Sequence, residues 1–452
     1  MRAPRFAVRD IGLYEREVRL RMPFRFGAVT LTGAPQAFAR ARIRLADGRE
    51  AEGAAAELLA PKWFDKDPAL TNEDNFAQLR ASLAQARKAY LAGPADTAFG
   101  HSRANYVAGL VSGFGPALVD RALLDALCRA LGASFYEGLR RNAAGIELEG
   151  CDADAFLAAL APAQSIAARH TVGLLDPITA GDVIEPVADG LPQTLEEVLE
   201  RYGQRYFKLK LAGDAAADLE RLGAIASVLE RIEGPYHATL DGNEQYDDIS
   251  GIAELWRRMN ADRRLARLAS SVLFIEQPIK RANALARDVT PLAAEIPLII
   301  DESDDSLEAF PRARALGYAG VSSKTCKGLY KSIINRARCA TWNREEGGAR
   351  YFMSAEDLTV QPGLALQQDL ALASLLGLAH VERNGHHYVN GMAGLPEAEQ
   401  AAFLHAHPDL YERSHGAVRL AIREGRMSIG SLDRAGYASG AAPDWTSTRK
   451  LM

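Results

Sequence analysis

The sequence is poor in cysteine and has no long apolar run. Four cysteines, Cys128, Cys151, Cys326 and Cys339, are scattered along 452 residues without a CxxC pair, so no disulfide framework is expected. Charged residues interrupt residues 1–21 every few positions, and no segment reaches the roughly 18–20 apolar residues that span a bilayer. We therefore expect a cytoplasmic protein with reduced thiols, no signal peptide and no membrane partner.

The sequence also lacks a strong excess of either charge. Lys and Arg number 53 against 58 Asp and Glu, a formal net charge of −5, which gives no reason to expect nucleic acid or an anionic membrane as a partner. Hydrophobic residues make up 48% and aromatic residues 7%, an ordinary composition for a globular chain with a large core. The length is typical of about two to three domains.

The first 150 residues are predicted to form a small α+β domain. Residues 36–46 alternate as a half-buried strand does, and Asp47-Gly48 after them favours a hairpin turn to a second strand at 49–54. Apolar residues at helical spacing predict two helices, at 74–92 and 116–132.

From about residue 170 short apolar strands alternate with helices. The predicted strands are 171–175, 206–210, 237–241, 272–276, 297–301, 319–323, 350–354 and 379–383. The predicted helices between them are 194–202, 214–231, 250–266, 282–287, 305–316, 329–346 and 363–377. Eight strands that alternate with helices favour a parallel α/β barrel over an open sheet, and we place it at 151–390. A C-terminal segment, 391–452, follows, in which residues 423–432 are predicted to pair with the first domain.

Carboxylates end three consecutive predicted strands. Asp241, Glu276 and Asp301 each follow an apolar run directly, and catalytic groups of such barrels come from the C-terminal ends of the strands. Any one of them could be a turn or helix-capping residue. Three carboxylates at one barrel mouth repel one another, however, and a bound cation would stabilise them. The absence of Cys and His at these ends argues against zinc, so an all-oxygen set predicts Mg²⁺, with Mn²⁺ possible.

Lysines end two other predicted strands. Lys208 and Lys210 share one face of the second strand, and Lys324 ends the sixth, which lies across a barrel from the second. An exposed edge strand is the alternative explanation for alternating lysines. Because a neighbouring cation disfavours the charged form, we expect a lysine pKa lowered enough for a general base.

The series Lys208-x-Lys210, Asp241-x-Asn243, Glu276-Gln277-Pro278, Asp301-Glu302-Ser303 and Lys324-x-x-Lys327-Gly328 resembles the enolase superfamily. It is closest to the branch with muconate lactonizing enzyme, dipeptide epimerases and o-succinylbenzoate synthase. The mandelate racemase branch has a histidine base on the seventh strand, which this sequence lacks. The resemblance implies a modified TIM barrel of the (β/α)7β type, with an N-terminal α+β capping domain completed by the C-terminal tail. It also implies a homo-oligomer.

The resemblance assigns roles to individual residues. It makes Asp241, Glu276 and Asp301 the metal ligands, and places Lys210 and Lys324 as bases on opposite faces of a small-molecule carboxylate substrate. It gives Lys208 the role of lowering its neighbour's pKa. Supporting positions near the metal or the lysines are Asn243 and Glu302.

Other polar residues at strand ends are candidates for contact with the substrate. Ser354 and Glu356 follow the seventh strand, and Glu382 and Asn384 belong to an unusually polar eighth strand. The simpler interpretation of the first two is a turn that starts the next helix. In the first domain, Trp63 and Phe64 either cover the ligand or pack at a domain interface.

Several reactions remain open. A lysine on each face favours racemisation or epimerisation by a 1,1-proton transfer. Elimination by a dehydratase, or cycloisomerisation, would use one lysine as base and the other to stabilise charge. Outside this class, a Schiff-base aldolase would use a lysine as nucleophile but leaves the carboxylates unexplained. A non-catalytic relative would share only the fold.

Overall fold

The computed structural model describes residues 3–27 and 29–452. Its first sheet is antiparallel, with the strand order β15-β1-β2-β3. These strands are β1 Phe6–Phe26, β2 Val29–Leu45, β3 Glu50–Leu58 and β15 Arg449–Lys450. The hairpin predicted around Asp47-Gly48 is present between β2 and β3. The sequence analysis missed β1, whose alternation is interrupted by register shifts at Val8/Asp10 and Arg19/Phe24.

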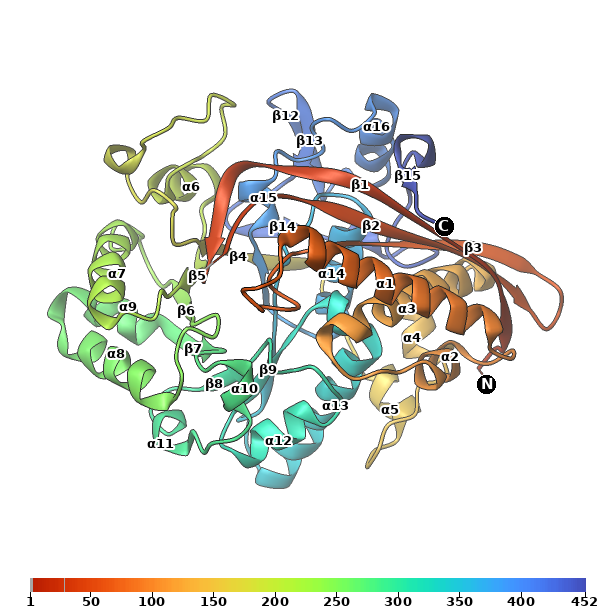
Figure 1. Cartoon of the computed structure of the whole chain (residues 1–452), viewed down its shortest axis with the longest axis horizontal. Helices are drawn as coiled ribbons and strands as arrows, with labels where there is room; N and C mark the ends of the chain where they lie inside the picture. The colour runs from red at the N-terminus through yellow and green to blue at the C-terminus, as the bar shows by residue number, and fades with distance from the viewer. Residues whose placement is uncertain (1–2, 28) are drawn as a thin grey trace.

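Five helices follow this sheet and partly cover it. They are α1 Asn72–Ala92, α2 Ala98–Ala104, α3 Leu110–Leu131, α4 Phe135–Arg140 and α5 Ala153–Ala158. The α3 helix packs directly on β3 because Gly53 has no side chain: a Cβ there would lie 2.2 Å from the backbone nitrogen of Ala126. Figure 1 shows this sheet and its helices on one side of the molecule, with the remaining strands beside them.

The second sheet is the predicted barrel. Its parallel strands run in the order β10-β9-β8-β7-β6-β5-β4-β11. Their bounds are β4 Ser165–Val172, β5 Tyr206–Lys210, β6 His237–Asp241, β7 Val272–Glu276, β8 Leu298–Ile300, β9 Gly320–Ser323, β10 Phe352–Ala355 and β11 His380–Arg383. The two end strands, β10 and β11, contact each other, so the sheet curls round. The predicted fold class is confirmed, and in this ring β5 lies opposite β9.

Helices connect the barrel strands as the sequence predicts. They are α6 Leu195–Tyr202, α7 Ala215–Leu229, α8 Ile249–Ala261, α9 Ala266–Ser271, α10 Arg281–Ala284, α11 Thr290–Ala293, α12 Ala309–Ala315, α13 Leu329–Glu346, α14 Leu364–Leu375 and α15 Gly385–Tyr388. A capping box of Thr194 and Glu197 begins α6, and the side chain of Asp214 caps α7. No helix in the described part of the chain is both long and apolar enough to cross a membrane.

The C-terminal segment reaches both sheets. After α16 Glu397–Ala406, the strands β12 Tyr411–Ser414 and β13 Ala417–Leu420 form a hairpin. The strand β14 Arg426–Ser428 pairs with β4 of the barrel, so the prediction that residues 423–432 pair with the first domain is wrong. The contact with the first sheet comes instead from β15, which pairs with β1 near the chain end. The prediction failed because an apolar strand pattern does not say which free edge it joins.

Candidate active site

The parallel register of the barrel brings the predicted carboxylates to one end. Lys210 is level with Asp241, and Asp241 with Glu276, on three neighbouring strands. Asp301 follows the next strand, β8, directly. All three carboxylates are at most 1% exposed. The strands β7 and β8 are apolar up to Glu276 and Asp301, so their polar chemistry lies at the strand ends, whereas β5 also carries the buried Lys208 within the strand.

The amine of Lys208 lies among four buried carboxylates. It is 2.9 Å from Asp241 and 2.8 Å from Glu276, and the other two partners are Glu356 at 2.7 Å and Glu382 at 3.1 Å. Burial disfavours the charged amine, but the four carboxylates outweigh it, so the pKa of Lys208 lies well above its ordinary value. Lys208 is therefore held as a cation at the centre of the site.

In the site formed by the protein's side chains alone, the pKa of Lys324 is raised and not lowered. Burial works against the charged form of Lys324 as well, but the carboxylate of Asp301, 2.6 Å away, raises the pKa of Lys324 above its ordinary value. A neighbouring cation lowers a lysine pKa, as expected from the sequence, but a closely paired carboxylate raises it, and this pairing was not apparent from the sequence.

Lys210 and Lys324 line one small chamber from opposite strands. The chamber has a volume of about 30 Å³. Each amine also lies against an aromatic ring from the first domain: Lys324 is 4.2 Å from the ring centre of Trp63 and Lys210 is 6.0 Å from that of Phe24. Lys210 contacts Asp241 at 2.6 Å. A lysine thus stands on each side of the chamber, and each of the two is paired with one strand-end carboxylate, Lys210 with Asp241 and Lys324 with Asp301.

Within the described ranges, several buried oxygen atoms near the strand ends lack hydrogen-bond partners. The buried Glu276 carboxylate has an ion-pair contact with Lys208 at 2.8 Å but accepts no hydrogen bond, and burial together with Glu356 raises the pKa of Glu276 well above its ordinary value. Glu302 and Asn243, the predicted supporting residues, are hydrogen-bonded to each other at 3.4 Å and each has one further buried oxygen without a partner. Buried oxygen atoms that lack partners suit a hard metal ion.

The lysines occupy the space between these oxygens. Among the described residues, no three His, Cys, Asp or Glu side chains are grouped closely enough to hold one ion. Lys208 bridges Asp241 to Glu276, and Lys324 pairs with Asp301. A cation at this position would therefore have to replace amine contacts with its own.

The remaining candidates divide into two pairs. Glu382 and Asn384 line the chamber, as expected for residues that contact a substrate. Ser354 and Glu356 do not line it; both bond to the buried guanidinium of Arg169 on β4. The sequence analysis missed Arg169, although an arginine in an otherwise apolar strand was a usable signal.

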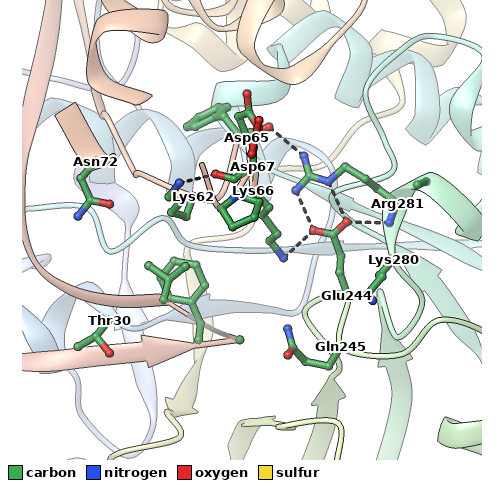
Figure 2. Close-up of a pocket in the computed structure, with 16 residues that line it drawn as sticks. Thr30, Lys62, Asp65, Lys66, Asp67, Asn72, Glu244, Gln245, Lys280 and Arg281 are labelled. Carbon is green, nitrogen blue, oxygen red and sulfur yellow. Dashed lines mark hydrogen bonds and ion pairs between the residues drawn. The ribbon is translucent and has the colours of Figure 1, made fainter. Parts of the chain in front are cut away.

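A larger cleft lies outside the chamber, between the two domains. It has a volume of about 940 Å³ and is lined by the end of β1, the start of β2, the loop between β3 and α1, and barrel residues 244–245 and 280–282. Figure 2 shows Glu244 directed toward both Lys66 and Arg281 in this cleft. Phe26 lines the cleft and the chamber alike.

Comparisons with known proteins find similarity in structure. No protein-family model and no curated protein matches the sequence. A muconate lactonizing enzyme from Pseudomonas fluorescens, solved with muconolactone, is 18% identical with a TM-score of 0.63, over 98% of both chains. A dipeptide epimerase from Cytophaga hutchinsonii, solved with Mg and the dipeptide D-Ala-L-Val, is 14% identical with a TM-score of 0.62, over 98% of this chain and 99% of that one.

An L-Ala-D/L-Glu epimerase from Bacillus subtilis is also similar, at 15% identity and a TM-score of 0.60, over 96% of this chain and 99% of that one. The similarity extends over both sheets and the C-terminal segment, and so over the whole arrangement that positions the strand ends. The resemblance seen in the sequence motifs is thus confirmed at the level of structure. The chain has the fold of the enolase superfamily, as found in muconate lactonizing enzymes and dipeptide epimerases.

Proposed function

We propose that the protein is a Mg²⁺-dependent enzyme that removes the proton next to a substrate carboxylate and returns a proton to the opposite face. The observation that carries the proposal is the placement of Lys210 and Lys324 around one chamber at the ends of opposite strands, with Lys210 paired to Asp241 and Lys324 paired to Asp301. The product would be the opposite stereoisomer of an amino acid derivative, a dipeptide or a related carbon acid.

The residues have two roles, metal binding and proton transfer. Asp241, Glu276 and Asp301 would hold the ion, which supplies positive charge to the substrate carboxylate as negative charge develops on it. A neutral lysine on one side takes the α-proton onto its Nζ, and the protonated lysine on the other side gives one to the same carbon. Asp301 holds Lys324 protonated, which suits donation.

Lys208 contributes charge and position. Its ammonium is enclosed by four carboxylates and is 1% exposed, so it neutralises part of a strongly negative site without reaching the substrate. Glu382 and Asn384, in the chamber wall, would bind the part of the substrate beyond the α-carbon.

One observation also favours a second reaction. Lys324 is held as a cation by Asp301 and covered by Trp63. A lysine that stays charged stabilises a developing anion without exchanging a proton. In that case Lys210 alone abstracts the proton, and the reaction is an elimination or a cycloisomerisation.

Proton exchange at the α-carbon tests the proposal. The protein is incubated with Mg²⁺ and pools of dipeptides, N-acylamino acids and hydroxy acids in D₂O, and deuterium incorporation is followed by NMR. We expect at least one acid to exchange only when both protein and Mg²⁺ are present. If the protein binds Mg²⁺ but exchanges no acid in any pool, proton abstraction is the wrong chemistry.

A further inference from the structure

The chamber is narrow in the present arrangement. Its volume is about 30 Å³, whereas that of the outer cleft is about 940 Å³. The cleft is large enough for a small organic acid, and a carbon acid that reaches the lysines from the cleft needs the wall between the two spaces to move.

The loop at 59–71, between β3 and α1, forms part of this wall beside Phe26, which lines both spaces. Its two aromatic residues face different spaces: Trp63 lines the chamber and Phe64 lines the cleft. Their rings pack edge to face with centres 4.9 Å apart. Trp63 is 3% exposed, and its indole N–H is buried without a hydrogen-bond partner. An unpaired buried donor is costly, and a substrate acceptor in an enlarged chamber would satisfy it.

Barrel residues hold this loop in place through charge. The guanidinium of Arg281 donates to the backbone carbonyls of Trp63 at 2.8 Å and Phe64 at 2.9 Å. The carboxylate of Glu244 accepts two hydrogen bonds from the same guanidinium, each at 2.8 Å. Glu244 also pairs with Lys66 of the loop at 2.5 Å. Figure 2 shows this cluster at the cleft wall.

The cluster also contacts the candidate metal site. Lys66 donates to the backbone carbonyl of Asn243 at 2.9 Å and lies 3.3 Å from Glu302. Asn243 and Glu244 both have left-handed backbone conformations, with φ of 41° and 69°. Such conformations are unfavourable for residues other than glycine and persist where surrounding contacts hold them. The cluster therefore constrains both the loop and the backbone next to Asp241.

We propose that Lys66, Glu244 and Arg281 form a latch that holds the loop at 59–71 closed, with Trp63 over Lys324, and that the latch must open for substrate to enter. Glu244 and Arg281 are positioning residues, since they act through the loop. The closing of the loop follows from contacts in this chain alone; its role in admitting a carbon acid rests on the proposed function.

The latch is expected to weaken with salt. Lys66 and Arg281 are each 27% exposed at the side chain while Glu244 is 5% exposed, so water and ions reach two of the three charges. Ion pairs at such positions are screened in part. Amide exchange in the loop at 59–71 should therefore become faster when NaCl is raised from 0.05 to 0.5 M. A loop held closed by apolar contacts alone would not show this increase.

Hydrogen exchange measured by mass spectrometry on the intact protein tests the latch without any substrate. Glu244→Gln and Arg281→Met should each speed amide exchange in the peptide at 59–71 by tenfold or more, and Lys66→Met by less. Glu254→Gln is the matched control, because Glu254 pairs with Arg257 on the exposed surface of α8. It should leave the loop unchanged.

Two results would overturn the latch. One is unchanged exchange at 59–71 in both Glu244→Gln and Arg281→Met. The other is a speed-up spread equally over the barrel strands, which would mean general destabilisation. Amide exchange does not depend on catalysis. If the latch variants behave as predicted but the protein never exchanges the α-proton of any acid, the latch is supported and only the proposed function is refuted.

Discussion

Replacing Glu276 by glutamine should separate the cost of a buried charge from its use in binding metal. Glu276 is fully buried, and the Lys208 amine at 2.8 Å offsets only part of the cost of its charge, since burial and the nearby Glu356 still raise its pKa. Its pKa is raised by burial, so the folded protein pays to ionise it at neutral pH. Glutamine has nearly the same shape and no charge. Without metal, we therefore expect Glu276→Gln to unfold at a higher temperature than the wild type.

With Mg²⁺ the order should reverse. A ligand that binds only the folded state at 100 times its dissociation constant adds about 2.7 kcal/mol of stability. Average unfolding entropies per residue imply about 1 kcal/mol/K for a chain of 452 residues. The melting temperature of the wild type should thus rise by about 3 °C when Mg²⁺ is added, while that of Glu276→Gln should rise by less than about 1 °C.

Differential scanning fluorimetry with EDTA or with Mg²⁺ measures both effects at one scan rate. The surface variant Glu254→Gln is the control for loss of a carboxylate and should follow the wild type in both conditions. Equal Mg²⁺ shifts in the wild type and in Glu276→Gln would refute the assignment of Glu276 as a ligand. A lower melting temperature of Glu276→Gln in EDTA would refute the charge argument.

Two further predictions concern other buried charges. Lys208→Met removes the cation shared by four carboxylates, and loss of one partner from a buried pair costs about 3–5 kcal/mol. The chemical denaturation midpoint of the variant should therefore fall. An unchanged midpoint would contradict the central role of Lys208. Burial raises the pKa of Asp120 to about 7, so the folded state binds this proton more tightly than the unfolded state between about pH 4 and 7. The contribution of this group to the free energy of unfolding falls as the pH rises through that range. The free energy of unfolding of Asp120→Asn, taken relative to that of the wild type, should therefore rise by about 3 kcal/mol between pH 5 and pH 8. A difference in denaturation midpoint between Asp120→Asn and the wild type that does not change with pH would contradict the raised pKa of Asp120.

The barrel could be predicted because each strand has a local signal. Apolar runs that end in a carboxylate or lysine fixed the positions of β5, β6 and β7 to the residue, and the strand order followed from the rule for parallel barrels. The long strand β1 was missed because bulges break its period-two pattern. The first barrel strand was predicted at 171–175 and lies at Ser165–Val172, since its buried Arg169 and His170 hide an otherwise apolar run.

The site could be predicted only in part. Residue types at strand ends suggested which side chains meet. Their pairing could not be read from the sequence, because it joins residues far apart in the chain, as between Lys66 and Glu302. The same limit applies to the pKa of Lys324, which is raised in the site formed by the protein's side chains alone because the Lys324 amine lies 2.6 Å from Asp301.

The stereochemistry of proton exchange in lysine variants tests the central claim most directly. Once a substrate is found, each enantiomer or epimer is incubated in D₂O with the wild type, Lys210→Ala and Lys324→Ala, and exchange is followed by NMR. The two lysines face the chamber from opposite strands, so each variant should lose exchange from a different stereoisomer while the wild type exchanges both. Loss of the same stereoisomer in both variants would contradict a base on each face.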